Sequence, residues 1–217
     1  WMMKIKKVLI GFILILNTLF AEEKTIKIAI SKDMVPYSFI DENNQASGIF
    51  VDYWNLWAQK TNQKIEFVPY SWHGTLDAVK TGDIDIHSGL FENEQRKSYI
   101  DYVKEIYPSQ AHIYLNANQK DINTLKDIDN KLLGVHSGSY YEAYMKQNYP
   151  KVKIKNFRTF GEQFNAIKNQ EIDLFIEDSL IAWFQLINDF AFNKVSILSN
   201  FEINKWFYAG VKRGNKS

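Results

Sequence analysis

Three polar residues, Arg96, Ser139 and Asp178, have the types and positions expected for recognition of a small polar molecule. Arg96 is one of only three arginines in a chain with 23 lysines. A guanidinium presents a rigid fork of donors that matches a carboxylate, and an ammonium does not. This favours Arg96 as the residue that binds an anionic group. The alternative is an ordinary surface arginine in the polar segment 92–97.

Ser139 and Asp178 each stand at a predicted strand-to-helix junction. Gly138 and Ser139 follow a predicted strand and precede a helix over about residues 140–148, whose free backbone N–H groups attract anions. Asp178 follows a predicted strand at residues 174–176 and precedes another helix. Both residue types are also common helix N-caps, so a binding role and a capping role stay open for each.

Aromatic residues provide a second set of candidates. Tyr37 and Trp72 are suited to an aromatic box that stacks on a ligand or faces a cation. The alternative is that they fill the core, which is the usual place for aromatic side chains in a chain with 6 Trp, 12 Tyr and 15 Phe.

The sequence predicts no metal site and no cofactor. It contains no cysteine, and its four histidines, His73, His87, His112 and His136, form no pair at helical spacing. They are expected to be structural, although His73 and His87 could lie beside a cleft. The sequence also lacks a glycine-rich phosphate loop and the common hydrolase motifs.

The elements that must position these residues alternate between strands and helices, which predicts an α/β fold. Residues 25–30 and 152–155 alternate as strands do. Asp52 is a candidate N-cap for the next helix, another helix ends at Thr81-Gly82, and residues 159–162 have the spacing of a capping box. A stripe on a later helix is predicted to face the core: Leu180, Trp183, Phe184 and Ile187.

An internal echo suggests two similar halves. Residues 71–87 align without a gap onto residues 159–175 at an offset of 88, and each copy predicts a helix that leads into a buried strand. Ligands of open α/β sheets bind beyond the carboxyl ends of the strands. Two facing halves would therefore form a cleft from the segments that follow Asp85 and Asp173.

Composition and charge narrow the class of protein. The 217 residues carry a formal charge of +1, with 46% hydrophobic residues, which excludes a disordered tail. Lys4, Lys6 and Lys7 precede an uncharged apolar run at residues 8–21, which predicts a signal peptide at 1–21, cleaved after Ala21. An uncleaved membrane anchor is the alternative. Without those three lysines, 23 basic residues face 25 acidic ones, so nothing indicates a nucleic-acid binder.

Several motifs in order resemble those of the bacterial extracellular solute-binding proteins of family 3. They are residues 26–30 with Pro36-Tyr-Ser-Phe39, Gly48-Ile-Phe-Val-Asp52, 72–85, Glu94-Gln-Arg96 with 102–107, Leu125-Lys-Asp-Ile128, Leu133-Gly-Val135 with Gly138-Ser139, and Ile172 to Asp178. The resemblance implies a two-lobed periplasmic-binding-protein-like fold, each lobe a sheet flanked by helices. It also implies closing helices that would follow Lys212 and that the sequence lacks.

The resemblance places lobe one at residues 24–110 plus 206–217 and lobe two at 111–205. It implies that Arg96 binds the carboxylate of the ligand and that Asp178 accepts from its amino group. The full set of expected ligand contacts is Arg96, Asp178, Ser139, Tyr140, Gly89, Tyr37 and Trp72. One departure is Phe91, which stands where amino-acid binders of the family usually carry Ser or Thr, and segment 85–91 is similar to that of sensory domains joined to diguanylate cyclases or histidine kinases.

The expected function is extracytoplasmic, periplasmic binding of an amino acid or a related carboxylate. The partner would be an ABC transporter permease or a membrane signalling domain of the same chain. The alternative of a different class is an enzyme of the same fold, similar to cyclohexadienyl dehydratases or associated with lytic transglycosylases, with Glu92, Glu94 or Glu177 as general acid.

Overall fold

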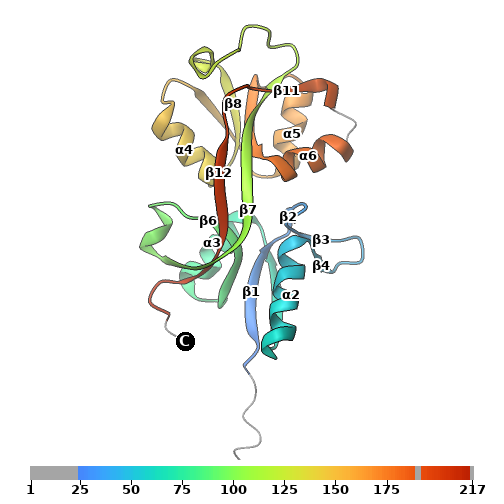
Figure 1. Cartoon of the computed structure of the whole chain (residues 1–217), viewed down its shortest axis with the longest axis vertical. Helices are drawn as coiled ribbons and strands as arrows, with labels where there is room; N and C mark the ends of the chain where they lie inside the picture. Colours follow the sequence, from blue (N-terminus) through green and yellow to red (C-terminus); the bar gives the residue numbers. More distant parts are fainter. Residues whose placement is uncertain (1–23, 189–191, 216–217) are drawn as a thin grey trace, which may run out of the picture.

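The computed structural model describes residues 24–188 and 192–215 (Figure 1). The predicted signal peptide at residues 1–21 and its cleavage after Ala21 lie outside these residues.

Among the described residues, one sheet of nine strands extends through the molecule in the order β5-β1-β6-β12-β7-β10-β8-β9, with β11 paired to β7. Its strands are β1 (Ile26–Ser31), β5 (Ile65–Tyr70), β6 (Ile86–Phe91), β7 (Ile100–Asn116), β8 (Leu132–His136), β9 (Lys153–Phe157), β10 (Leu174–Asp178), β11 (Val195–Ile197) and β12 (Ile203–Lys212). A small antiparallel sheet consists of β2 (Asp33–Met34), β3 (Ser38–Ile40) and β4 (Ala46–Ser47).

The large sheet contains two groups of three parallel strands, in addition to β7, β11 and β12. Helices cover each group, so the molecule has two lobes (Figure 1). Strands β5, β1 and β6 are parallel in the first lobe, and β10, β8 and β9 are parallel in the second. The helices are α2 (Ile49–Thr61) and α3 (Trp72–Thr81) in the first lobe, and α4 (Tyr140–Asn148), α5 (Phe160–Lys168) and α6 (Ser179–Asn188) in the second. This arrangement is the α/β architecture that the alternating pattern predicted.

Two long strands, β7 and β12, connect the lobes. They pair with one another in antiparallel fashion along most of their length, from Ile203 opposite Ala111 to Lys212 opposite Ile100. At one end β12 also pairs with β6, and at the other end β7 also pairs with β10. The backbone ladder therefore continues from one lobe into the other.

Helix boundaries follow the punctuation of the sequence at three places. Gly82 ends α3 in the left-handed conformation, with φ of 89°. Thr159 and Glu162 form the predicted capping box at the start of α5. Helix α4 begins after Ser139 and spans the residues expected for it.

The expected N-cap of α2 was wrong. The helix begins at Ile49, and Asp52 lies within its first turn. Backbone carbonyls take the place of a capping side chain, because Ile49 N donates to Pro36 O and Phe50 N donates to Tyr37 O. Gly48, at φ of 112°, permits this close approach, since a Cβ there would lie 2.7 Å from both carbonyl oxygens.

The orientation predicted for α6 was also wrong. Its buried side chains include Ile181, Ala182 and Leu186, which pack over the sheet. The stripe that was expected to face the core is between 38% and 54% exposed: Leu180, Trp183, Phe184 and Ile187. The helix is apolar around most of its circumference, so its sequence period does not indicate which face is covered.

The internal echo corresponds to two equivalent helix–strand units. Helix α3 leads into β6, and helix α5 leads into β10, at the same offset of 88 residues. All residues of β10 are buried, and so are five of the six in β6. Each copy therefore supplies a central strand to its own lobe, as predicted.

Gly89 is packed so closely that a methyl group at this position is expected to destabilise the fold. A Cβ at Gly89 would lie 2.5 Å from the ring of Phe50, which is fully buried. Overpacking of this kind costs about 1–3 kcal/mol, so Gly89→Ala should lower the urea midpoint of unfolding accordingly. Gly161→Ala is the matched control, because no described atom outside its own helix and chain neighbours lies within 4 Å of its Cβ position. This change should raise the free energy of unfolding by about 0.5 kcal/mol. Equal midpoints for the two variants would contradict the close packing at Gly89.

Candidate functional site

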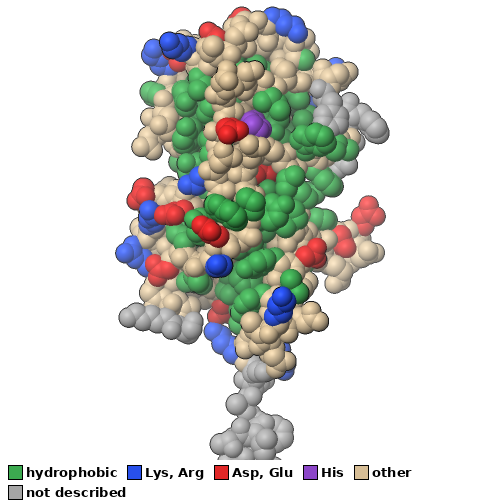
Figure 2. Space-filling view, in the orientation of Figure 1, with side chains coloured by type: hydrophobic (Ala, Val, Ile, Leu, Met, Phe, Trp, Pro, Cys, Tyr) green, Lys and Arg blue, Asp and Glu red, His purple; other side chains and the backbone are tan. Residues whose placement is uncertain are grey.

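A small cavity of about 30 Å³ lies between the two lobes. Its lining residues come from both of them: Met34, Trp72, Phe91 and Phe207 from the first lobe, and His136, Ser139, Tyr140, Tyr141, Phe160, Glu177, Asp178 and Ile181 from the second. The front face of the molecule shows hydrophobic side chains gathered across the junction of the lobes (Figure 2). The cavity is therefore an aromatic chamber with two carboxyl groups in its wall.

Asp178 is the most strongly hydrogen-bonded group of this chamber. It is 1% exposed, and its Oδ1 accepts from Tyr37 OH at 2.9 Å and from the backbone N–H of Leu180 and Ile181 at 2.8 and 3.3 Å. Its Oδ2 accepts from Ser109 Oγ at 2.5 Å. The side chain thus caps α6 and lines the cavity at once, so the capping role is present and does not compete with a position in the site.

The hydrogen bond from Tyr37 crosses between the lobes. Tyr37 is fully buried in the first lobe, where its ring stacks on Phe50 at 5.0 Å and its hydroxyl reaches Asp178 in the second. Burial and the neighbouring Asp178 raise the pKa of the Tyr37 hydroxyl, which therefore stays protonated and donates. Burial also raises the pKa of Asp178, against the opposing effect of its donors Ser109 and Tyr37.

Arg96 lies beside the cavity and is not part of its wall. Its side chain is 2% exposed, and its Nη1 and Nη2 donate to Phe91 O and Gly138 O, both at 2.9 Å. The Trp72 ring lies 5.3 Å from the guanidinium carbon. Arg96 is therefore a buried cation, as a binding arginine would be, but in this structure backbone carbonyls accept its hydrogen bonds.

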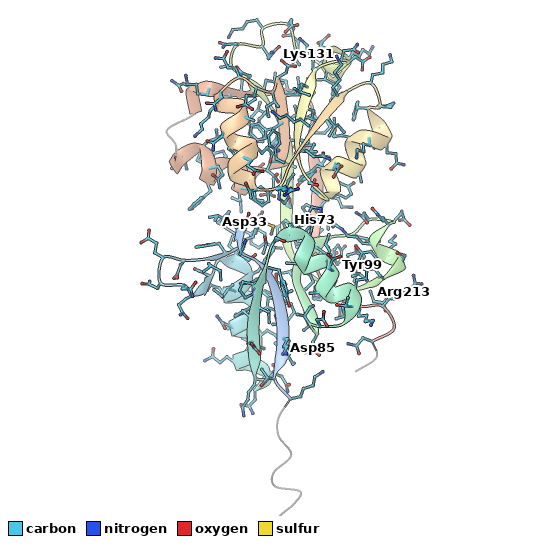
Figure 3. The ribbon with its side chains drawn as sticks, turned by 180° about the vertical axis from the view of Figure 1, so that it is seen from behind. Asp33, His73, Asp85, Tyr99, Lys131 and Arg213 are labelled. Atoms are coloured by element: carbon cyan, nitrogen blue, oxygen red, sulfur yellow. The ribbon has the colours of Figure 1, made fainter. Side chains whose placement is uncertain are left out.

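Arg96 contributes to a second, larger cavity of about 480 Å³ at the edge of the junction. His73, Tyr99 and Ser139 are among its other lining residues, and Figure 3 shows His73 where the lobes meet. Asp85 and Lys131 lie at opposite ends of the molecule, away from this region (Figure 3).

The start of α4 is capped by its own residues. Ser139 Oγ accepts from Glu142 N at 3.2 Å, and Gly138 N donates to Glu142 Oε2 at 2.7 Å. The expected anion site at this helix start therefore has its first donor occupied by an internal carboxylate. Gly138 contributes in another way, since its carbonyl accepts from both Trp72 Nε1 and Arg96 across the junction.

Only some of the predicted site residues lie together in the structure. Asp178, Ser139, Tyr140 and Trp72 line the small cavity, and Tyr37 contacts it through Asp178. Trp72 and its echo partner Phe160 both belong to the wall, so the repeat brings one aromatic from each lobe to the same chamber. Gly89 lies elsewhere, packed on Phe50 with its N–H donating to His87 Nδ1.

Glu177 is a buried acid with one oxygen in use. It is 2% exposed; its Oε1 accepts from Asp178 N at 2.9 Å, and its Oε2 has no hydrogen-bond partner among the described residues. Burial raises the pKa of Glu177 well above its usual range, the Asp178 N–H opposes the rise, and the charge of Asp178 adds to it. The sequence indicated Glu177 as a candidate general acid and as a neighbour of Asp178 that would bind the ligand if the register differed by one residue.

Two histidines near the junction are neutral structural residues. Burial lowers the pKa of His87 to about 3, and Arg96 adds to the effect. Since its Nδ1 accepts from Gly89 N, its Nε2 carries the proton and donates to Thr75 Oγ1 at 2.9 Å. His136 stacks on Phe160 and contacts Arg158 O through Nε2. Within residues 24–188 and 192–215, no group of three His, Cys, Asp or Glu side chains could hold a metal ion.

Several wall residues carried no local signal that sequence reasoning could use. Phe207 lines the cavity from β12, and Ser109 of β7 reaches it only through its hydrogen bond to Asp178; neither crossing strand has a motif at these positions. Tyr141 lies inside a helix, where an aromatic residue predicts only a core position. Phe91 was the one visible sign, because it departs from the Ser or Thr of the resemblance, and it does line the cavity.

A family model for the bacterial extracellular solute-binding proteins, family 3, matches residues 26–150, more than half of the chain. The chain belongs to this family. The match covers both the Arg96 segment and the start of α4, and it ends before β10 and Asp178.

Relatives agree with the assignment. A probable histidine-binding protein of Campylobacter jejuni is 26% identical over 156 residues, which are 71% of this chain and 60% of that protein. This chain thus spans about three fifths of the length of that curated relative. In the parts that the structure describes, no helix combines the length and the apolar character that a membrane crossing requires.

Solved structures of two-lobed binding proteins share the fold. An ancestral arginine-binding protein bound to glutamine superposes with a TM-score of 0.77 at 26% identity, covering 88% of this chain and 85% of that one. A histidine kinase sensor domain with similarity to periplasmic binding proteins gives a TM-score of 0.82 at 18% identity, covering 89% and 84%. The second likeness concerns the fold alone.

Glu177→Gln is expected to stabilise the protein at neutral pH and to have little effect near pH 4. An acid whose pKa rises on folding binds more protons in the folded state, so stability falls as pH rises above the unfolded value near 4.5. The glutamine variant has no ionisable group at this position and so avoids this loss of stability. Each unit of difference between the folded and unfolded pKa is equivalent to about 1.4 kcal/mol in the free energy of unfolding. Urea unfolding of both proteins at pH 4 and pH 8 measures the difference.

The matched control is Glu171→Gln, an exposed acid of the same lobe that pairs with Lys155. Glu171→Gln should not become more stabilising as pH rises, because the Lys155 ammonium lowers the pKa of Glu171. An identical stability change for Glu177→Gln at both pH values would show that this carboxyl is ionised in the folded protein.

Proposed function

We propose that this chain binds a small polar solute, an amino acid or a related carboxylate, between its two lobes. The observation that carries the proposal is the aromatic chamber at the junction, with the buried Asp178 carboxyl in its wall, in a member of a solute-binding family. The names of the compared proteins support it, since they bind histidine, arginine or glutamine by their descriptions.

Within this proposal, Asp178 accepts from the amino group of the ligand, and Tyr37 orients Asp178. Trp72, Tyr140 and Ser139 contact the body of the ligand from the wall of the cavity. Arg96 binds a carboxylate when the hydrogen bond from its guanidinium to Gly138 O is replaced by a hydrogen bond to the ligand. Gly89 has no direct role, because it lines neither cavity.

Binding of a solute larger than a few atoms requires the lobes to move. The chamber of about 30 Å³ has room for one or two waters, whereas small-molecule sites are typically 300–1,000 Å³. We place lobe one at residues 24–110 plus 206–217 and lobe two at 111–205, so that both crossings fall within β7 and β12. A ligand then raises the population of closed molecules to the extent that its affinity for the closed form exceeds its affinity for the open form.

The proposed setting is the periplasm, with delivery of the solute to an ABC transporter permease or signalling through a membrane domain of the same chain. Transport is supported by a relative described as ABC transporter arginine-binding protein 1 of Escherichia coli, 22% identical over 162 residues, and signalling is supported at the level of the fold by the sensor domain. We propose binding without catalysis. The dehydratase alternative would use Glu177 as the general acid, because this residue is buried in the cavity wall and burial raises its pKa.

Asp178→Asn is expected to abolish ligand binding while the protein remains folded. The amide keeps an acceptor for Tyr37 and the α6 N–H groups but loses the charge that pairs with an amino group, which costs about 2–5 kcal/mol, or at least roughly 30-fold in affinity. A thermal-shift screen against amino acids, small carboxylates and polyamines measures this, since a ligand at a hundred times its dissociation constant adds about 2.7 kcal/mol.

The control for this variant is Asp121→Asn, an exposed acid that pairs with Lys131. It should bind like the parent chain. Full-strength binding by Asp178→Asn would remove Asp178 from the site, and turnover of prephenate or arogenate by the parent chain would replace pure binding by the enzyme alternative.

A further inference from the structure

Glu177 is a buried acid in the wall of the chamber. It is 2% exposed, and among the described residues only one of its two carboxyl oxygens has a partner, the N–H of Asp178. An unsatisfied buried acceptor costs about 1–3 kcal/mol, so the cost is removed by any bound group that brings a donor to Oε2. Burial favours the protonated form of Glu177 in the ligand-free chamber, whereas a cation that brings an N–H donor favours the ionised form and would form the strongest such bond with it.

The rest of the wall suits a cation as well. Half of the residues that line the chamber are aromatic rings, contributed by both lobes: Trp72, Phe91, Tyr140, Tyr141, Phe160 and Phe207. Aromatic faces attract ammonium and guanidinium groups, and they do so more strongly in desolvated sites. The chamber therefore combines two acids with a surrounding set of rings.

No positive charge balances these acids within the chamber. Arg96 does not line it, and both terminal nitrogens of its guanidinium donate to the backbone carbonyls of Phe91 and Gly138. His136 is the one basic side chain of the wall; burial lowers its pKa, so it is neutral at pH 7. A carboxylate brought into the chamber would meet Glu177 and Asp178 without a partner.

We propose that Glu177 acts together with Asp178 to bind the ammonium group of an organic cation, and that the ligand class is protonated amines for which a carboxylate is dispensable. This inference rests on the proposed function, because it concerns the same cavity. The ammonium group fits the chamber of about 30 Å³, and the rest of the ligand is accommodated as the lobes part.

The test compares each amino acid with its decarboxylated amine on the same protein. Isothermal titration calorimetry is done with arginine against agmatine, lysine against cadaverine, and ornithine against putrescine, with succinate as an anion without an amine. Binding of at least one amine within tenfold of its parent amino acid, and no binding of succinate, is expected.

Glu177→Gln should weaken amine binding at least tenfold, whereas the exposed control Glu171→Gln should leave it unchanged. Circular dichroism and urea unfolding serve as the check that both variants are folded. Equal amine affinity in Glu177→Gln and the parent chain would overturn the role of Glu177.

Two further results would overturn the inference in distinguishable ways. Binding of the amino acids with amines more than a hundredfold weaker would show that the carboxylate is required, and the proposed function would stand. No binding by any amino acid, amine or carboxylate would overturn the proposed function itself, and the inference with it.

Discussion

The buried carboxyl of Asp178 is the interaction on which the junction of the lobes depends. Its two oxygens accept from the Tyr37 hydroxyl of the first lobe, from Ser109 on the crossing strand β7, and from the first N–H groups of α6. A charged group this deeply buried is tolerated only when several donors satisfy it. The same hydrogen bonds therefore join the lobes, start a helix and set the position of an acid in the cavity wall.

The two lobes are built from the same helix–strand unit but present different chemistry to each other. At the offset of 88 residues, Gly89 and Leu90 of β6 correspond to Glu177 and Asp178 of β10. The first lobe thus contributes apolar and aromatic surface to the junction, and the second contributes both acids. Repetition of the unit produces the cleft, and divergence at these strand ends produces its polarity.

Arg96 and Asp178 occupy separate environments, although both are buried at the junction. Arg96 is held by the carbonyls of Phe91 and Gly138, with its guanidinium over the Trp72 ring, while Asp178 and Glu177 line the aromatic chamber. Burial raises the pKa of both carboxyls. The two carboxyl groups of the wall suit the proposed binding of a group that donates hydrogen bonds.

The sequence alone determined the family, the α/β class and most helix boundaries, because these follow from local order: capping residues, turn glycines and alternating periods. It also identified Asp178, Ser139, Tyr140 and Trp72 as candidates, since motif spacing places them at strand ends and helix starts. Only the tertiary structure decided which face of α6 is covered, that Asp52 lies within a helix whose first donors are satisfied by a distant loop, and that Phe207 and Tyr141 meet at one cavity where Ser109 bonds to Asp178. These outcomes depend on contacts between segments far apart in the chain. The free oxygen of Glu177 is of the same kind, because burial and an absent partner are properties of the surroundings of a residue and leave no trace in its neighbours along the sequence.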